Sequence, residues 1–302
     1  MSAYNDLGDR TAGPLESLQE LNSEFAAKAQ PDQGVCIQSG GYLLELSLDW
    51  IVLRASENVH HLLGKSHVTL IEEPIGRFVH AQALHDLRNL FSRLSGTTGI
   101  GRAYGVRLTD EHDFVDIAFQ LSDGRVLLEA VPSAGSFGEA FGTIGGLIAG
   151  LSDNHGQSLL DGGARRMRAL TGYDRVTMSC GDRQAESSRG AFAGPAQGSG
   201  GLPVIITDTR AEPVAIFPRD GEDQAAGDAL MRSAGQATLE ELDKAGIRST
   251  LRVSFSAGGA EGEFRCDNRT PRAPSFECHA AAELFAQMFA LRLENDGLKT
   301  AD

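Results

Sequence analysis

Cysteine, basic residues and long apolar runs are all scarce in this chain. The 302 residues include four cysteines, and no two of them form a Cys-x-x-Cys pair: Cys36, Cys180, Cys266 and Cys278. Isolated cysteines of this kind predict free thiols in a reducing compartment. No apolar run approaches the roughly 20 residues of a membrane helix, and residues 1–30 lack the basic-then-apolar order of a signal peptide. We therefore expect a cytoplasmic protein without a membrane segment.

The shortage of basic residues also bears on the partners of the chain. Lys and Arg number 27 against 41 Asp and Glu, which gives a net charge of −14. Nucleic-acid binding requires clustered Lys and Arg side chains against the phosphates, so we expect no nucleic-acid partner. The motifs GxSxG and HExxH are missing as well, and no pair of carboxylates is spaced for acid–base catalysis. The sequence therefore predicts a protein that is not an enzyme.

Histidine and cysteine do not follow a metal-binding pattern either. Two sets of candidate ligands can be formed: His60, His61 and His67, and Cys266, Cys278 and His279. Neither set has the spacing of a known zinc site. On a helix, the adjacent His60 and His61 are expected to point to different faces. We expect no bound metal.

One stretch is unusually rich in glycine and alanine. It reads RGAFAGPAQGSGGLPV over residues 189–204. A phosphate-binding loop would carry a lysine at the Walker position and lead into an amphipathic helix, and this stretch does neither. The composition predicts a surface loop.

Hydrophobic periodicity and turn residues divide the chain into two α+β units. A helix is expected over 14–29 and a glycine-containing connecting helix over 136–152. The first unit is expected to contain strands at 42–48 and 50–56, a short helix near 57–64, a helix at 80–94, and strands at 104–108, 113–121 and 125–131. The second is expected to contain a helix from 163 that stops at Gly172, a strand to 180, short strands at 202–208 and 213–217 around a turn, a largely helical stretch at 227–246, paired strands at 249–256 and 262–267, and a final helix at 274–294.

Several words of the sequence occur in the order known from one family. They are GVCIQSGGYLLEL (34–46), ASENVHHLLG (55–64), DIAFQLSDGRVLLE (116–129), RALTGYDRV (168–176), TDTRAEPV (207–214), AGIRSTLRVSF (245–255) and TPRAPSFECHAAAELFAQMFALRLE (270–294). On these words, the chain resembles the PAS–GAF photosensory module of bacterial phytochromes.

The resemblance implies an α+β fold with a PAS domain followed by a GAF domain, each with a central antiparallel sheet flanked by helices. The implied divisions are an N-terminal segment with a helix (1–33), PAS (34–135), a connecting helix (136–149), GAF (150–296) and the start of a C-terminal connector (297–302). The acidic end, ENDGLKTAD, is interpreted as a solvated tail or as the beginning of that connector helix.

The resemblance also implies where biliverdin would be held, and most of those positions carry other residues. The N-terminal segment has no cysteine for covalent attachment, and the stretch between Glu186 and Pro203 lacks the aspartate that faces the pyrrole nitrogens. Ser179 stands for a tyrosine, Thr238 for a histidine, and Asp267 and Asn268 for a histidine pair.

Three positions keep a match or a related group. Arg232 and Ser233 match an arginine–serine pair whose arginine holds a propionate, and Thr250 keeps a hydroxyl where the family has a serine. Arg252 replaces a second serine. We therefore expect a vestigial bilin pocket, which comprises Arg232, Ser233, Thr238, Thr250, Asp267 and Asn268. The expected cofactor is none, with biliverdin as the alternative.

The expected function is that of a regulatory input module of a phytochrome-like signalling protein, plausibly a histidine kinase, that acts without a bilin. The final helix is apolar over a wide arc, and a helix of that kind usually meets a second partner. Leu284, Met288 and Leu291 are the expected homodimer contacts, and the output domain would lie outside this chain. Two alternatives stay open: a photoreceptor with an atypical or non-covalent biliverdin site, and a GAF-type sensor of another small molecule.

Overall fold

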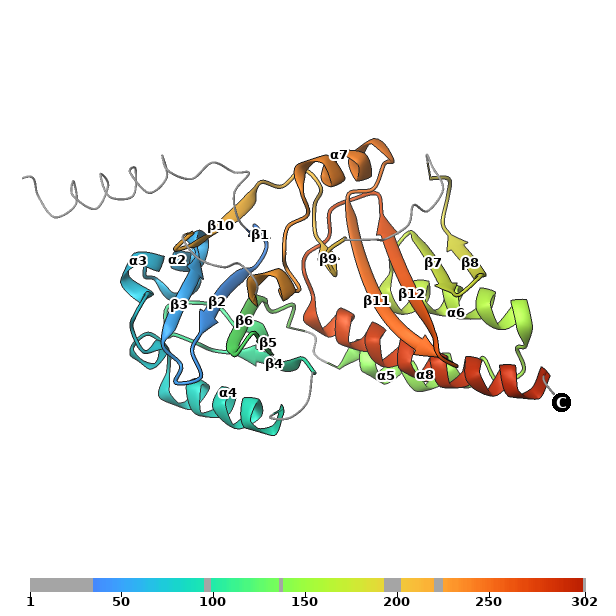
Figure 1. Ribbon diagram of the computed structural model, residues 1–302, viewed down its shortest axis with the longest axis horizontal. Coiled ribbons are helices and arrows are strands. Elements are labelled where there is room, and N and C mark those ends of the chain that lie inside the picture. The colour runs from blue at the N-terminus through green and yellow to red at the C-terminus, as the bar shows by residue number, and fades with distance from the viewer. Residues whose placement is uncertain (1–34, 95–98, 136–137, 193–201, 220–224, 301–302) are drawn as a thin grey trace, which may run out of the picture. The chain divides into compact units, whose positions relative to one another are not determined.

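A computed structural model describes residues 35–94, 99–135, 138–192, 202–219 and 225–300. The helix expected over 14–29 lies outside the described residues. Two antiparallel sheets run through the described chain, and helices lie against each of them (Figure 1). The prediction of an α+β fold is confirmed.

The first sheet has the strand order β1-β10-β3-β2-β6-β5-β4. Its strands are β1 (Cys36–Gln38), β2 (Tyr42–Leu46), β3 (Val52–Ser56), β4 (Gly101–Val106), β5 (Val115–Ser122), β6 (Arg125–Pro132) and β10 (Pro213–Phe217). Its helical elements are η1 (Glu57–Val59), α2 (His60–Leu63), α3 (His67–Leu70), η2 (Ile75–Arg77) and α4 (Ala81–Leu94). Trp50, Leu70, Leu87 and Phe119 belong to the core between the sheet and these helices. We call this part of the molecule the PAS lobe.

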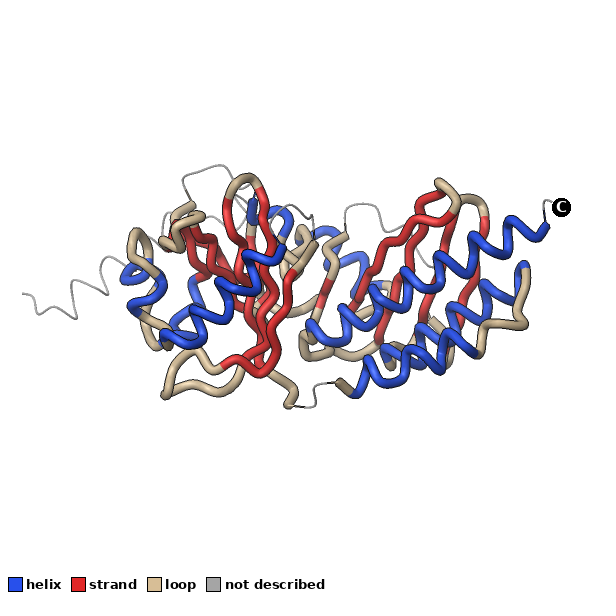
Figure 2. The backbone as a smooth tube through the Cα atoms, turned by 90° about the horizontal axis from the view of Figure 1, so that it is seen from below, coloured by secondary structure: helices blue, strands red, loops and turns tan. Residues whose placement is uncertain are grey.

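The second sheet has the order β8-β7-β12-β11-β9. Its strands are β7 (Arg175–Cys180), β8 (Arg183–Ser188), β9 (Ile205–Ile206), β11 (Ser249–Ala257) and β12 (Ala260–Asn268). The helical elements of this part of the chain are α5 (Glu139–Ala149), α6 (Gly156–Thr171), η3 (Ala225–Asp228), α7 (Gln236–Lys244) and α8 (Phe276–Thr300). Figure 2 shows α5, α6 and α8 together over one face of this sheet. We call this part the GAF lobe.

Aromatic packing fixes α8 on that face. Phe285 and Phe289 of α8 are fully buried against the ring of Phe264 on β12, with centroid distances of 6.0 and 5.2 Å. Edge-to-face pairs at such distances are the favoured arrangement of aromatic rings. The next helix in the layer, α6, ends as expected at Gly172, whose left-handed backbone favours glycine.

The strands predicted at 202–208 and 213–217 do not pair around a turn, so that expectation is wrong. β9 pairs with β11 in the GAF lobe, whereas β10 pairs with β1 and β3 in the PAS lobe. The stretch expected to be helical over 227–246 contains only the end of η3 and α7. Both errors have one cause: the connection between β9 and α7 packs against the other lobe, and local periodicity carries no information about such distant partners.

Two other boundaries differ from expectation. The strand predicted at 104–108 begins earlier, at Gly101. Up to Asp296, the acidic end is part of α8 and is not a solvated tail. The helix continues to Thr300, and the Asp296 side chain is buried. Its carboxylate accepts the N–H of Gly156 at 2.8 Å and lies 2.5 Å from Nδ1 of His155, at the start of α6.

Candidate functional site

The GAF sheet has one apolar face and one polar face, and two residues of the predicted vestigial pocket, Thr250 and Asp267, lie on the polar face. On β7, Val176, Met178 and Cys180 face the helices, so the alternating positions Arg175, Thr177 and Ser179 lie on the other side. The same alternation puts Thr250 and Arg252 of β11 and Glu263, Arg265 and Asp267 of β12 on this side. Charged side chains therefore occupy the face where the resemblance implies a pigment.

A buried ion network lies at the centre of this polar face. Thr250, Asp267 and Arg175 are cross-strand neighbours on β11, β12 and β7. Arg175 donates to Oδ2 of Asp267 from Nε at 3.1 Å and from Nη2 at 2.7 Å. Arg265 donates from Nε to Oδ1 of the same carboxylate at 2.8 Å. Asp267 is 0% exposed and both arginines are 2% exposed, so the three side chains form a desolvated Arg–Asp–Arg cluster.

The cluster is extended by neighbouring side chains. The Arg175 guanidinium lies 4.2 Å from the centre of the Phe192 ring, a cation–π distance. On β11, Arg252 donates to Oε2 of Glu263 and to the carbonyl of Leu202. The charges of Arg175, Arg265 and Arg252 are therefore paired with carboxylates of the protein itself.

Thr250 and Asp267 are the two predicted pocket residues that the structure brings together. Thr250 is fully buried, and its hydroxyl has no hydrogen-bond partner among the described residues. Asn268 lies at the end of β12 and has a structural role. Its amide donates to the carbonyl and hydroxyl of Thr270, and its Oδ1 accepts the N–H of Asp174 at 3.2 Å.

The predicted residues Arg232, Ser233 and Thr238 do not join this cluster. The Ser233 N–H donates to the carbonyl of Cys36 at 2.7 Å, and Arg232 forms an isolated bridge with Ile37. Both residues therefore pair through their backbone with β1. Thr238 is half-buried on α7.

β1 is held along both of its edges by the β9–α7 connection. On one side Cys36, Ile37 and Gln38 pair with β10, and on the other the Gln38 N–H donates to the carbonyl of Met231 at 2.9 Å. The buried Gln38 side chain accepts the N–H and hydroxyl of Thr207 at 2.6 and 2.8 Å. Ile37 and Gln38 therefore bind the PAS lobe to the β9–α7 connection.

Burial affects two thiols of the GAF lobe, those of Cys266 and Cys278. Burial raises the pKa of the Cys266 thiol, and it raises the pKa of Cys278 to about 11. A thiol becomes a nucleophile only as the thiolate, so neither side chain is prepared for covalent attachment of a ligand at neutral pH.

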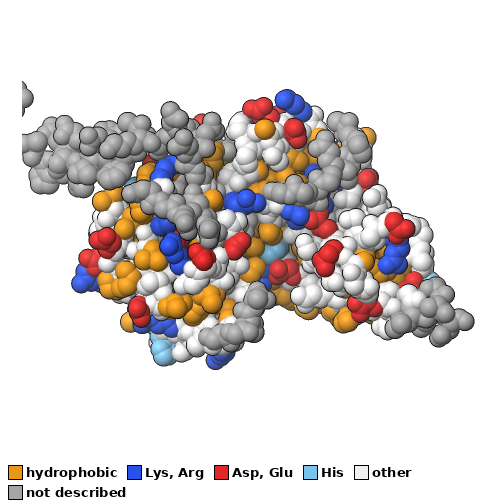
Figure 3. Space-filling view, viewed as in Figure 1, with side chains coloured by type: hydrophobic (Ala, Val, Ile, Leu, Met, Phe, Trp, Pro, Cys, Tyr) orange, Lys and Arg blue, Asp and Glu red, His pale blue; other side chains and the backbone are white. Residues whose placement is uncertain are grey.

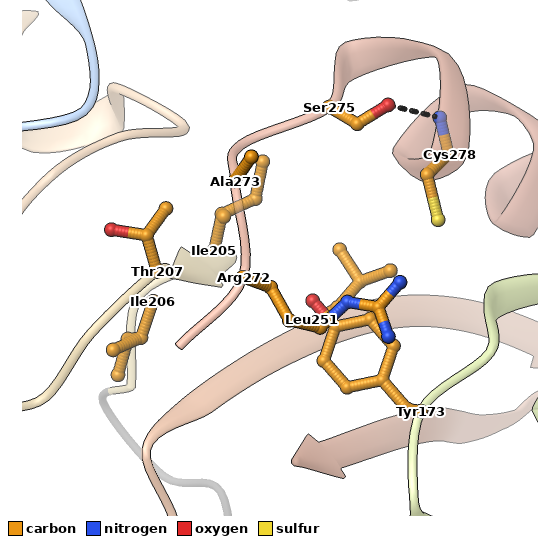
Figure 4. A pocket seen from close by; sticks show the side chains of 9 residues that line it. All are labelled: Tyr173, Ile205, Ile206, Thr207, Leu251, Arg272, Ala273, Ser275 and Cys278. Carbon is orange, nitrogen blue, oxygen red and sulfur yellow. Dashed lines mark hydrogen bonds between the residues drawn. The ribbon is translucent and has the colours of Figure 1, made fainter. Parts of the chain in front are cut away.

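The close-packed interior next to β9 contains a cavity of about 30 Å³. It is lined by Tyr173, Ile205, Ile206, Thr207, Leu251, Arg272, Ala273, Ser275 and Cys278 (Figure 4). Sites for drug-sized ligands measure about 300 to 1,000 Å³, so this cavity holds about one water molecule. A groove of about 620 Å³ lies on the helical side, where Thr143, Leu147 and Leu170 line it. Neither space is lined by a predicted pocket residue.

The described residues bear on the expectations about metal ligands, the His60–His61 pair, a membrane helix and surface charge. In that part of the chain, no group of three or more His, Cys, Asp or Glu side chains is placed to hold a metal. The rings of His60 and His61 do not point apart, since their centroids lie 3.9 Å from each other where a 3-10 turn runs into α2. None of the described helices is long and apolar enough to cross a membrane. On the face drawn in Figure 3, basic and acidic side chains lie interspersed.

Sequence reasoning missed the arginines that give the polar face its charge. Arg175 and Arg265 were part of strands, but their roles were not assigned. A signal was present: β12 carries charged residues at every second position, Glu263, Arg265 and Asp267, and such residues share one face of a strand. Residues 193–201 of the glycine-rich stretch 189–204 lie outside the described residues, so the surface loop expected there stays a prediction.

Comparison with known proteins agrees with this architecture. Residues 27–132 match the PAS fold family. A bacteriophytochrome of Pseudomonas aeruginosa is 26% identical over 290 residues, which cover 85% of this chain and 39% of that protein. The chain therefore spans about two fifths of the length of this curated relative.

Solved structures give the same result for the fold. The chromophore-binding domain of an unusual bacteriophytochrome from R. palustris is 23% identical with a TM-score of 0.72, over 88% of this chain and 96% of that one. The chromophore-binding domain of Stigmatella aurantiaca phytochrome P1 is 24% identical with a TM-score of 0.69, over 87% and 98%. The predicted resemblance to the PAS–GAF module of bacteriophytochromes is confirmed.

Proposed function

We propose that this chain is the sensory input module of a phytochrome-like signalling protein and that it acts without a bilin chromophore. The observation that supports this proposal is the buried Arg175–Asp267–Arg265 cluster. A tetrapyrrole against the polar face would have to displace three desolvated, mutually bonded charges, or leave them buried without their partners. Breaking a buried ion pair in this way costs about 3 to 5 kcal/mol.

Asp267 and the size of the cavity beside β9 support the same proposal. Asp267, at a position where the family has a histidine, is committed to two arginines. The cavity beside β9 is an order of magnitude smaller than a ligand site.

The wider proposal concerns the protein of which this module forms a part. We retain the division into PAS (34–135), connecting helix (136–149) and GAF (150–296), and we propose that the module is cytoplasmic and non-catalytic. We also propose that signals pass along α8 into an output domain, a histidine kinase. Leu284 and Leu291 are 41% and 62% exposed beside the half-buried Met288, which supports a homodimer through this helix.

Mixing the purified protein with biliverdin tests the central proposal. We expect an unchanged biliverdin spectrum, no response to red illumination and no increase in melting temperature. A red-shifted, photoreversible absorption band would instead establish the alternative, a photoreceptor with an atypical bilin site. Asp267→His combined with Arg175→Met makes a matched variant, because it restores a family-like histidine and removes one of the two arginines that bind the carboxylate. If that variant binds biliverdin and the natural chain does not, the ion network is what prevents binding.

A further inference from the structure

One row of residues across the PAS sheet contacts two separate parts of the GAF lobe. Arg102 on β4 pairs with Ala118 on β5, and Ala118 pairs with Glu129 on β6. Side chains that are directly opposite on adjacent strands lie on the same face of a sheet. Ala118, between the two charged residues, is buried in the core cluster that contains Phe285 and Phe289 of α8. The row therefore lies where the PAS sheet meets the GAF lobe.

At one end of this row, Arg102 holds α8. Its Nη2 lies 2.8 Å from Nδ1 of His279 and 2.6 Å from Oε2 of Glu283, which are neighbours one turn apart on α8. The Arg102 side chain is 12% exposed and that of His279 is 3% exposed. Burial and the nearby Arg102 charge lower the pKa of His279 to about 3. The imidazole is therefore neutral and accepts the guanidinium N–H at Nδ1, which places its own proton on Nε2.

At the other end, Glu129 holds the β9–α7 connection. Its carboxylate accepts the N–H of Leu230 and the N–H of Met231, both at 2.8 Å. Glu129 is 2% exposed, and Arg102 is the charged side chain whose attraction acts on it. The connection is thereby fixed to the same strand row that fixes α8.

Stability alone does not explain this arrangement. Arg102, a neutral His279 and the Glu129 carboxylate are largely or fully withdrawn from water, and Nε of Arg102 is buried without a hydrogen-bond partner among the described residues. Buried charged clusters are often no more stabilising than apolar side chains of the same volume, but they fix one geometry. The hydrogen bonds from this row of residues reach two elements that are far apart in the chain. Arg102 and Glu129 are therefore suited to holding those two elements in position.

We propose that the Arg102–Ala118–Glu129 row is the mechanical link through which the PAS lobe positions α8 and the β9–α7 connection together. Arg102 and Glu129 are positioning residues in this proposal. It rests on the proposed function only in giving α8 the output role; the link itself is a property of this chain. A change in the PAS sheet would then be transmitted to α8 without any ligand in the GAF lobe.

Hydrogen exchange with mass spectrometry on the full chain tests the link. Leu70 on α3 is fully buried in the PAS core, apart from the Arg102–Ala118–Glu129 row. Leu70→Ala leaves a cavity there and loosens the PAS lobe. We expect it to accelerate exchange in the PAS lobe at least about tenfold, and to accelerate the amides of 278–286 in α8 by a similar factor. When Leu70→Ala is combined with Arg102→Met, the PAS amides should still respond and the α8 amides should no longer respond.

Arg77→Met is the matched control, because Arg77 forms an exposed pair with Glu73 inside the PAS lobe. In that background the response of α8 should persist. If Arg102→Met does not fold, Glu283→Gln removes the charged acceptor and serves in its place. NMR titration gives a second readout: without Arg102, the pKa of His279 should rise. The proposal is overturned if Leu70→Ala accelerates exchange in α8 equally with and without Arg102. It is also overturned if Leu70→Ala alone leaves exchange in α8 unchanged. None of these measurements uses biliverdin, so they succeed or fail independently of the proposed function.

Discussion

Replacing Asp267 by asparagine is the most direct test of the polar face of the GAF sheet. The substitution keeps the shape of the side chain and removes its charge. Asp267 accepts three hydrogen bonds from guanidinium groups, at 3.1, 2.7 and 2.8 Å. Asparagine retains one acceptor oxygen and points an NH₂ group at one of the arginines, so at least one bond is lost and one contact becomes repulsive.

The magnitude follows from burial. A hydrogen bond to a charged group contributes about 1.5 to 3 kcal/mol, and removing one partner of a buried ion pair costs about 3 to 5 kcal/mol. Arg175 and Arg265 would remain as two desolvated cations 2% exposed, with their shared counter-ion gone. We therefore expect Asp267→Asn to lower the free energy of unfolding by about 3 to 5 kcal/mol. Single domains have only about 5 to 15 kcal/mol in total.

Urea denaturation followed by circular dichroism measures this loss. Asp174→Asn is the control, since Asp174 pairs with Arg269 at a site where that arginine is 42% exposed, and surface pairs contribute about 0 to 1 kcal/mol. If Asp267→Asn does not fold, Arg265→Gln breaks one bond of the cluster and leaves the Arg175–Asp267 pair. A loss below about 1 kcal/mol for Asp267→Asn would refute the reasoning, because the carboxylate would then not be the essential counter-ion of the cluster.

Three further predictions concern pH, dimerisation and helix packing. Burial raises the pKa of Glu129 to about 7 from an ordinary value near 4.5, so its contribution favours the folded state at low pH and is lost as the pH rises through 7. The unfolding free energy, relative to Glu129→Gln, should therefore fall by roughly 3 kcal/mol between pH 4 and pH 8 in denaturant titrations; a difference independent of pH contradicts this. Leu284→Glu with Leu291→Glu should convert the proposed dimer to a monomer in light scattering, and a natural chain that is already monomeric at high concentration would exclude that dimer. Gly163→Ala should cost about 1 to 2 kcal/mol in thermal unfolding, because the added Cβ would lie 2.4 Å from the Phe289 ring; unchanged stability would show that the helix layer adjusts freely.

Local patterns predicted most of the elements but not their partners. The strands expected at 113–121 and 125–131 pair as β5 and β6, the strand expected to end at 180 is β7, and Gly172 ends α6 as expected. These signals depend on a residue and its close neighbours in the chain. β10 was also recognised as a strand, but its pairing with β1 and β3 depends on residues more than 150 positions away.

The candidate site shows the same division. The resemblance drew attention to Thr250 and Asp267, and the strand register makes them cross-strand neighbours. It gave no role to Arg175 or Arg265, because the comparison with pigment-binding relatives was limited to the positions that hold the pigment. Only the strand register brings these arginines to Asp267.

The enclosure of β1 by the β9–α7 connection has a consequence for how the chain is made. β1 ends at Gln38, and its partner Pro213 is synthesised 175 residues later. At about 5 to 20 residues per second, β1 and the outer edge of β3 wait roughly 9 to 35 s on the ribosome for β10. During that interval the PAS sheet has open strand edges, which are templates for pairing with other chains. The order of synthesis therefore leaves the PAS sheet incomplete until residue 217 has been made.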